Sequence, residues 1–201
     1  ERIGEEDSFL ELKENGSRNF FRQNFPGGVK DHKAAFEEMA KSLKKFLPDI
    51  GYIGHRVVHG GEEFTSTTRL NHLVINKLAK YNKLAPLHNP VNLVCIKKSW
   101  ELFPQIDQYA IFDTAYYRTL PDYIFRYALP EKLYTEYGIR RYGFHGISHE
   151  YAALEGSKKA KINFSKAKII TCHLGSGCSM TATKDGKALS TTMGFTPLEG
   201  L

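Results

Sequence analysis

The feature that most constrains the fold of this chain is the stretch of residues 168–183, KIITCHLGSGCSMTAT. An apolar, β-rich run at 169–172 leads into the Gly-X-Gly segment at 173–177, and a second β-rich run at 179–183 follows it. This pattern predicts two strands joined by a glycine turn, with a further turn at residues 185–186. Glycines can let backbone N–H groups lie against an anion, although an ordinary tight turn would produce the same pattern.

Composition limits the class of protein. With 201 residues, 41% of them hydrophobic, the chain is long enough to form the core of one or two domains. The formal net charge is +6, but the 28 basic residues are scattered rather than clustered with aromatic residues. We therefore expect no nucleic-acid binding, whereas a mildly basic cleft for an anionic small molecule fits the charge.

The cysteines and the hydropathy pattern bear on the compartment. The cysteines are odd in number and lie in or beside apolar runs, at Cys95, Cys172 and Cys178. This usage favours a reducing compartment over a disulfide framework. We find no signal peptide and no apolar run of membrane length, so we expect a cytoplasmic protein without membrane association.

Local patterns predict several other elements. Residues 1–25 read as strand–turn–strand around Asn15-Gly16, and Asp31 can cap an amphipathic helix that ends before Pro48. We expect the apolar stripe of that helix, which includes Phe46, to pack in the core. A second helix is expected at residues 70–81.

A β-branched run after Ile50 predicts a strand that carries Arg56 and ends at Gly60-Gly61. Arg56 could form an exposed salt bridge or bind a ligand. On a strand His55 and His59 would share a face, but a metal site there is disfavoured because no third ligand is spaced nearby.

Polar residues lie at the ends of two predicted elements. Asn89 can cap a helix that has Pro90 at its first position and stops before Pro104. His88 comes just before this helix N-terminus, which favours anions, so His88 could help to hold an anion or be a surface loop residue. Asp113 ends a short buried strand, where it could bind Mg²⁺, take a proton or cap a helix.

Residues 116–142 read as a connection rather than as regular structure. His145 follows, placed between glycines, and Ser148 can cap the helix that comes next. His145 and His149 are four residues apart, but a zinc site is disfavoured without the glutamate of an H-E-x-x-H motif or another ligand.

Taken together, six motifs resemble those of the acetokinase family, which comprises acetate, propionate and butyrate kinases. They occur in the family's order and spacing and span nearly the whole chain: GHRVVHGG at 54–61, LAPLHNP at 84–90, FDTA at 112–115, YGFHG at 142–146, HLGSG at 173–177 and MGFTPLEGL at 193–201. Six linked motifs are far more specific than any one of them.

The resemblance implies an α/β fold of the two-lobed actin, Hsp70 and sugar-kinase type, which is ribonuclease H-like. Residues 1–115 would form the first lobe, on the acyl-substrate side and without its N-terminal strand. Residues 116–201 would begin the second, nucleotide-side lobe. The implied reaction is reversible transfer of the γ-phosphoryl group of ATP to acetate or another short carboxylate, with Mg²⁺ as cofactor. The implied state of the complete protein is a homodimer.

The resemblance also implies roles for individual residues. The catalytic residues would be Asp113, His145, Arg56 and His88, with Arg56 also binding the substrate and Asp113 on the metal side. The apolar pocket for the substrate would be lined by Val58, Leu87, Phe144 and Pro197. The ATP phosphate loop would comprise His173, Leu174, Gly175, Ser176 and Gly177. Because a carboxylate acceptor is already ionised at pH 7, Asp113 is better suited to orienting groups than to acting as a strong base.

The chain departs from the family pattern at Ser176, where Asn is usual, and at Tyr117, where His is common and where we expect an effect on packing alone. Two alternatives stay open: a truncated, non-catalytic anion-binding or interaction module, and an acyl phosphatase that uses the same cleft. We expect the 201-residue segment to be inactive by itself, because the family's first strand and several nucleotide-side residues would lie outside it.

Overall fold

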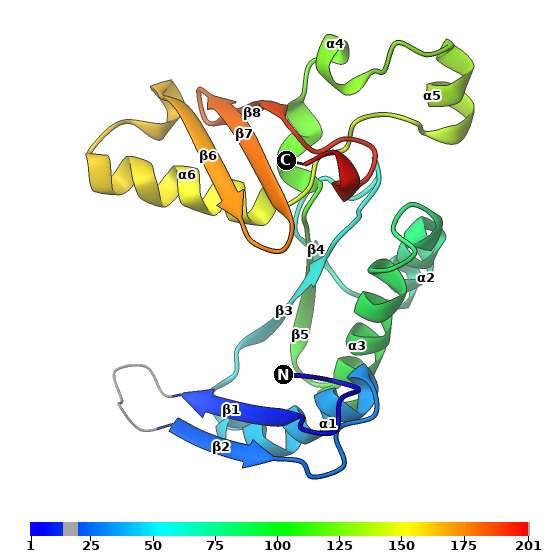
Figure 1. The fold of residues 1–201 in the computed structure, drawn as a ribbon, viewed down its shortest axis with the longest axis vertical. Helices are drawn as coiled ribbons and strands as arrows, with labels where there is room; N and C mark the ends of the chain where they lie inside the picture. The colour runs from blue at the N-terminus through cyan, green and yellow to red at the C-terminus, as the bar shows by residue number, and fades with distance from the viewer. Residues whose placement is uncertain (14–19, 201) are drawn as a thin grey trace. The chain divides into compact units, whose positions relative to one another are not determined.

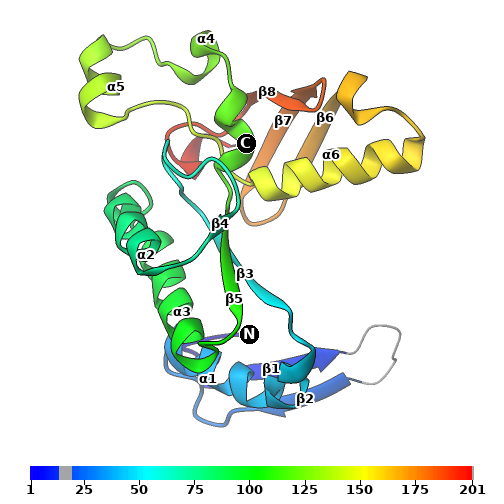
Figure 2. The same cartoon turned by 180° about the vertical axis from the view of Figure 1, so that it is seen from behind.

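A computed structural model describes residues 1–13 and 20–200 of the chain (Figures 1 and 2). These residues form two compact units. The first comprises residues 1–53 and 91–108, and the second comprises residues 54–90 and 109–201.

The first unit contains an antiparallel hairpin of β1 (Phe9–Lys13) and β2 (Phe20–Asn24), in which Phe9 pairs with Asn24. The predicted strand–turn–strand is thus confirmed for its strands. The turn predicted at Asn15-Gly16 lies outside the described residues.

Helix α1 (His32–Leu43) begins as predicted, because the Asp31 carboxylate accepts the Ala34 N–H at 2.9 Å. The helix ends earlier than predicted, and Lys44–Asp49 form the 3₁₀ helix η1. Pro48 has no N–H and disfavours α-helical geometry in the residues before it, so the backbone changes from an α-helix to the tighter 3₁₀ helix ahead of Pro48. The prediction that Phe46 packs in the core is wrong: its side chain is 41% exposed, because the three-residue period of η1 turns it off the helix stripe.

In one three-stranded sheet, β5 (Asp107–Phe112) lies between β3 (Tyr52–Val57) and β4 (Thr68–Arg69), and β4 runs antiparallel to β5. Residues 54–57 of β3, residues 109–112 of β5 and all of β4 belong to the second unit. The predicted strand around Arg56 is confirmed. It stops before His59, so the expectation that His55 and His59 share a strand face is wrong.

The helices that follow these strands have largely the predicted positions. The helix predicted at residues 70–81 is α2 (His72–Ala79), capped by the Asn71 side chain and continued by η2 (Lys80–Lys83). Helix α3 (Asn89–Leu102), whose residues from Val91 onward belong to the first unit, stops before Pro104 as predicted.

The Gly-X-Gly stretch folds as the predicted hairpin. Strands β6 (Lys168–Leu174) and β7 (Cys178–Lys184) pair antiparallel, with Leu174 opposite Cys178 at the turn. Strand β8 (Lys187–Thr191) follows a two-residue turn at Asp185 and Gly186, both with positive φ, as a type I′ turn requires. Both views show α6 (Gly146–Ala160) lying along one face of this sheet, beside β6 (Figures 1 and 2).

The buried face of β7 carries hydroxyl groups. Ser179, Thr181 and Thr183 alternate along the strand and are all buried. The Tyr117 hydroxyl lies 2.9 Å from the Thr181 hydroxyl, and the Tyr116 hydroxyl lies 2.8 Å from that of Thr183. This interface is therefore held by hydrogen bonds between side chains as well as by apolar contact.

Residues 116–142, expected to be a connection, contain short helices. These are η3 (Ala115–Thr119), α4 (Asp122–Phe125) and α5 (Glu131–Tyr137). Their apolar residues form a cluster with β8, made of Tyr116, Tyr117, Leu120, Phe125 and Ala188. The remaining 3₁₀ turns are η4 (Phe164–Lys166) and η5 (Pro197–Glu199).

For the part of the chain that the structure describes, every helix is too short or too polar to cross a bilayer.

Candidate functional site

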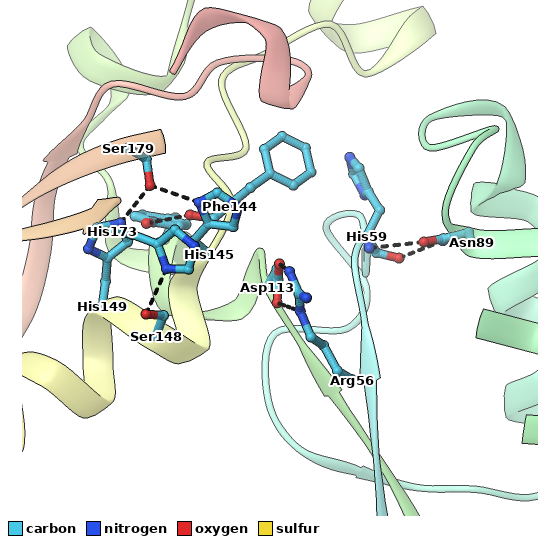
Figure 3. A network of polar contacts seen from close by, with 11 residues as sticks. Arg56, His59, Asn89, Asp113, Phe144, His145, Ser148, His149, His173 and Ser179 are labelled. Atoms are coloured by element: carbon cyan, nitrogen blue, oxygen red, sulfur yellow. Dashed lines mark hydrogen bonds and ion pairs between the residues drawn. The ribbon is translucent and has the colours of Figure 1, made fainter. Parts of the chain in front are cut away.

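An arginine–carboxylate pair lies at the ends of two neighbouring strands. Arg56 is on β3, and Asp113 directly follows β5, where its N–H donates to the Val57 carbonyl at 3.1 Å. The Arg56 Nε and Nη2 donate to the two Asp113 oxygens at 2.9 and 2.7 Å (Figure 3). Asp113 is buried, with 1% of its side chain exposed, whereas 60% of the Arg56 side chain is exposed. Hydrogen bonding to Asp113 raises the pKa of Arg56, so this guanidinium stays charged.

This geometry leaves part of the guanidinium available. The pair uses the edge of Arg56 formed by Nε and Nη2, so Nη1 and the second Nη2 proton form another fork. An exposed fork of this kind matches a carboxylate or a phosphoryl group in two-point contact.

A glycine joins Asp113 to the start of α6. The Gly146 N–H donates to the Asp113 carbonyl at 2.9 Å, and a Cβ at Gly146 would lie only 2.2 Å from that oxygen. Only glycine permits this approach, which places the N-terminus of α6, and therefore His145, next to Asp113.

His145 precedes α6 in left-handed backbone geometry, with φ of 57°, and its ring stacks on His173 of β6. The ring centroids are 4.0 Å apart and the planes differ by 24°. Burial and the charge of His173 lower the pKa of His145, while the charge of Asp113 opposes that change. His145 is therefore neutral near pH 7.

The glycine turn of the β6–β7 hairpin lies against these imidazoles. A Cβ at Gly177 would lie 3.1 and 3.2 Å from Cε1 and Nε2 of His145, and one at Gly175 would lie 3.6 Å from Nε2 of His173. Leu174 and Ser176 in the same turn are exposed. The structure thus brings the predicted phosphate loop next to the predicted catalytic histidine.

Polar residues behind the imidazoles hold them in place (Figure 3). The Ser179 Oγ of β7 lies 2.9 Å from Nδ1 of His145 and 2.8 Å from Nε2 of His149. The Thr171 Oγ1 lies 2.7 Å from Nδ1 of His149. His149 is buried, and burial is the main cause that lowers its pKa to about 4.

Ser148 does not cap α6, contrary to the prediction. The helix begins at Gly146, so Ser148 falls inside its first turn, and its hydroxyl bonds Nδ1 of His173 at 2.9 Å. Ser148 therefore orients His173 instead of closing the helix.

Two of the four predicted pocket residues share one cluster. Val58 and Phe144 are buried with Ala85, Tyr142 and Met193, and the half-buried Leu84 and Phe195 pack against them. The Phe144 carbonyl accepts the Tyr117 hydroxyl at 2.8 Å, so the residue before His145 is anchored as well.

The other predicted residues lie apart from this cluster. Leu87 is 82% exposed, His88 is exposed in the same loop, and Pro197 is half-buried at the start of η5. Across residues 1–13 and 20–200, no hydrogen bond or ion pair joins His88 to Arg56, Asp113 or His145. Their predicted roles stay predictions.

His59 is a buried structural residue. The Asn89 amide bonds both its N–H and its carbonyl, at 3.0 and 2.9 Å, so Asn89 holds the His59 backbone instead of capping α3 as predicted. The His59 Nδ1 accepts the Gly61 N–H at 3.0 Å, and the ring lies edge-on to Tyr142 with centroids 4.4 Å apart. Burial lowers the pKa of His59 to about 4.

Asp113, predicted to lie on the metal side, pairs with Arg56 in this structure. Both Asp113 oxygens are occupied by Arg56, and the described ranges contain no group of three or more His, Cys, Asp or Glu side chains placed to hold a metal ion. The role predicted for Asp113 on the metal side stays a prediction.

Sequence reasoning missed Ser179 and Thr171, whose hydroxyls bond the site histidines. It also missed that Asn89 bonds the His59 backbone. A signal was present for Ser179, because Ser179, Thr181 and Thr183 alternate along β7 as a core-facing set would. No local sequence pattern indicates that Thr171 bonds His149 or that Asn89 bonds the His59 backbone, since both contacts arise from tertiary packing.

Comparisons with known proteins agree on one family. The profile described as "Acetokinase family" matches residues 1–201. An acetate kinase from Clostridium botulinum (strain Hall) is 45% identical over 208 residues, which cover 100% of this chain and 51% of that protein. Among solved structures, a propionate kinase from Francisella tularensis superposes with a TM-score of 0.90 at 39% identity, and Porphyromonas gingivalis acetate kinase with 0.87 at 38%. Each structural match covers 100% of this chain and 51% of the other. The chain thus spans about half the length of these relatives, and the predicted α/β fold class is confirmed.

Proposed function

Because this chain belongs to the acetokinase family, we propose that the protein transfers the γ-phosphoryl group of ATP reversibly to a short carboxylate, giving an acyl phosphate and ADP. Acetate or propionate is the proposed acceptor, in keeping with the names of the relatives. The residues described above would supply the acceptor side of the site and part of the phosphate side.

The observation that carries the proposal is the Arg56–Asp113 pair. A buried carboxylate holds one edge of the guanidinium at 2.9 and 2.7 Å, while most of the arginine side chain stays exposed. Fixing the guanidinium in advance reduces the side-chain entropy lost when its free fork binds an anion. Asp113 then acts as the group that orients Arg56, not as a base, because both of its oxygens are engaged.

The chemistry needs no deprotonation of the acceptor. A carboxylate oxygen, already ionised at pH 7, would attack the γ-phosphorus, and the bond to the β–γ bridging oxygen would break with its electrons leaving on ADP. Charge on the transferring group lies on its equatorial oxygens, so positioned donors are the main catalytic device.

His145 and the glycine turn suit that charge. The imidazole is neutral, stacked on His173 and adjacent to Gly177, so a ring N–H can donate to a phosphoryl oxygen while the turn approaches the phosphates. Val58 and Phe144 would contact the methyl end of the acceptor, and Leu87 and Pro197 would complete that pocket.

The first test replaces Arg56 in the protein expressed from its complete gene. Arg56→Ala should slow acyl-phosphate formation by about 100-fold or more, the usual cost of losing a donor to a developing charge. Arg56→Lys should recover little, because lysine has no planar fork. Hydroxamate formation from acetate and MgATP measures the rate. Arg118→Ala, which removes an exposed arginine of η3, is the matched control. Full activity of Arg56→Ala would remove Arg56 from the site.

A second test compares acceptors. The small pocket should favour acetate or propionate, with each added methylene changing kcat/KM by about 10–200-fold. A maximum at butyrate or at a branched acid would contradict the proposed pocket.

The same assays separate the alternatives. Release of phosphate from acetyl phosphate without ADP would indicate an acyl phosphatase, and anion binding without turnover would indicate a binding module. Because the chain spans about half the length of its relatives, we propose that residues 1–201 alone show no turnover. Light scattering of the complete protein tests the proposed homodimer, and cell fractionation tests the proposed cytoplasmic location.

A further inference from the structure

We propose that Ser179 is a positioning residue that fixes which nitrogen of His145 carries the proton, as the last hydroxyl of a hydrogen-bonded chain that runs from Thr171 through His149. This inference deepens the proposed function, because it rests on the role of His145 there. It assigns a role to Ser179 and Thr171, which no motif in the sequence marks.

The chain is continuous and lies within the second unit. Thr171 Oγ1 is 2.7 Å from Nδ1 of His149, and Nε2 of the same ring is 2.8 Å from Ser179 Oγ. Ser179 Oγ is in turn 2.9 Å from Nδ1 of His145 (Figure 3). Ser179 is 0% exposed, and His149 and Thr171 are buried as well, so water does not compete for these bonds.

A neutral imidazole has one N–H donor and one acceptor, whereas a hydroxyl has one donor and two acceptor lone pairs, so the protons of the chain have three possible arrangements. In the first, Thr171 donates to Nδ1 of His149, Nε2–H of His149 donates to Ser179, and Ser179 donates to Nδ1 of His145. In the second, every bond is reversed, and His145 donates from Nδ1. In the third, Ser179 accepts from both imidazoles, and its own proton points away from them.

The first direction satisfies every proton of the chain. In the second direction, the Thr171 hydroxyl accepts from His149, and its own proton would need another acceptor. Within the described ranges, the Thr171 hydroxyl bonds His149 alone. In the third arrangement the buried Ser179 proton would lack an acceptor, because the Ser179 hydroxyl of the described chain bonds only the two imidazoles. A buried donor without a partner costs free energy, so the first direction is favoured.

The consequence falls on His145. With Nδ1 accepting from Ser179, the proton resides on Nε2, and that nitrogen lies on the side of the ring next to Gly177. The donor therefore faces the glycine turn. If His145 instead became an imidazolium, Nδ1–H would have to donate to Ser179, and either the Ser179 proton would lose its acceptor or the whole chain would have to reverse. The arrangement thus holds His145 as a neutral donor.

The electrostatics agree with this arrangement. Burial is the main cause that lowers the pKa of His149 to about 4, with smaller effects of His145 and His173. Burial also lowers the pKa of His145. Both rings are therefore neutral near pH 7, as a chain with one direction requires.

The direct test is the tautomer of His145 in the complete protein. Long-range ¹H–¹⁵N correlation spectra of protein labelled with ¹⁵N-histidine distinguish protonated from unprotonated ring nitrogens, and His145→Gln assigns the resonances. We expect Nδ1 to be unprotonated and Nε2 to be protonated. Protonation at Nδ1 in the unaltered protein would overturn the proposal without any variant.

Two variants test the cause. Ser179→Ala removes the shared hydroxyl, so the His145 signals should show a mixture of tautomers. The value of kcat should fall by about 10-fold, as expected for the loss of one hydrogen bond that orients a group in the site, while KM for the carboxylate is unchanged. Ser157→Ala is the matched control, because it removes another buried hydroxyl, one that bonds the Ala153 carbonyl within α6 at 2.7 Å. If Ser179→Ala does not fold, Thr171→Val removes the first donor of the chain and should give the same mixture.

The outcomes separate this proposal from the proposed function. Acyl-phosphate formation with an unchanged tautomer in both variants would overturn the positioning role and leave the kinase proposal intact. The expected tautomers without any acyl-phosphate formation would support the chain and refute the proposed reaction.

Discussion

Replacing Gly146 with alanine tests the contact that joins Asp113 to His145. The new Cβ would lie 2.2 Å from the Asp113 carbonyl oxygen and 2.9 Å from the Tyr116 Cβ, whereas ordinary contacts begin at 3.4 Å. The start of α6 would have to move by about 1 Å, which lengthens or breaks the bond from the Gly146 N–H.

The magnitude follows from three effects. Overpacking costs about 1–3 kcal/mol, and loss of the hydrogen bond costs about 1 kcal/mol. The greater helix propensity of alanine returns up to about 1 kcal/mol. The free energy of unfolding should therefore fall by about 2 kcal/mol, which for a domain of this size lowers Tm by about 4–8 °C.

Gly156→Ala is the matched control, because it makes the same change in the same helix at an exposed position where a Cβ meets nothing within 4 Å. That variant should gain about 0.5–1 kcal/mol. Urea unfolding followed by circular dichroism measures both changes, and the hydroxamate assay should show a loss of activity for Gly146→Ala only. Equal stability of the two variants would refute the claim that this position requires glycine.

The remaining predictions concern buried polar groups. Tyr117→Phe should destabilise the protein by about 1–3 kcal/mol in urea unfolding, because it leaves the Phe144 carbonyl without its partner and the Thr181 hydroxyl with only its bond to Thr191. Tyr116→Phe, which loses one bond to Thr183, should cost less, and the reverse order would contradict the assignment. The pKa of His59 is about 4 when folded and 6.5 ordinarily, so the unfolded chain binds this proton more tightly: His59 contributes about 3 kcal/mol of stability above pH 6.5, which is lost as the pH falls towards 4. His149 has the same lowered pKa, so His59→Phe should reduce the slope of unfolding free energy against pH over that range and leave the part due to His149. An unchanged slope would exclude His59 as a source of it.

Local sequence signals predicted much of the fold. The Asp31 cap, the glycine turn of the β6–β7 hairpin and the stop before Pro104 follow from backbone preferences of single residues, so they could be inferred without tertiary information. The end of α1 was placed too late, because the effect of a proline extends over the preceding residues and periodicity continues past it.

The motifs of the candidate site could be predicted from the sequence, whereas the hydrogen bonds that hold its residues in place could not. Arg56 and Asp113 stand at strand ends, where polar residues are informative. Their bidentate pairing depends on which strands are neighbours. The roles of Asn89 and Ser148 were misassigned because both residues suit a helix start, and only packing reveals that a distant backbone or an imidazole takes their hydrogen bonds instead.

The hydroxyl-lined face of β7 affects how this strand can pair. A slip of one residue along β6 would turn Met180 and Ala182 inward in place of Ser179 and Thr181. An apolar face could tolerate such a slip, because methyl and methylene groups pack in many orientations. Here the Tyr117 hydroxyl and two imidazole nitrogens would lose their partners together. Directional hydrogen bonds therefore fix the register of β7 against β6. A misaligned hairpin would lack the bonds that also hold the site in place, so it would be less stable than the native one.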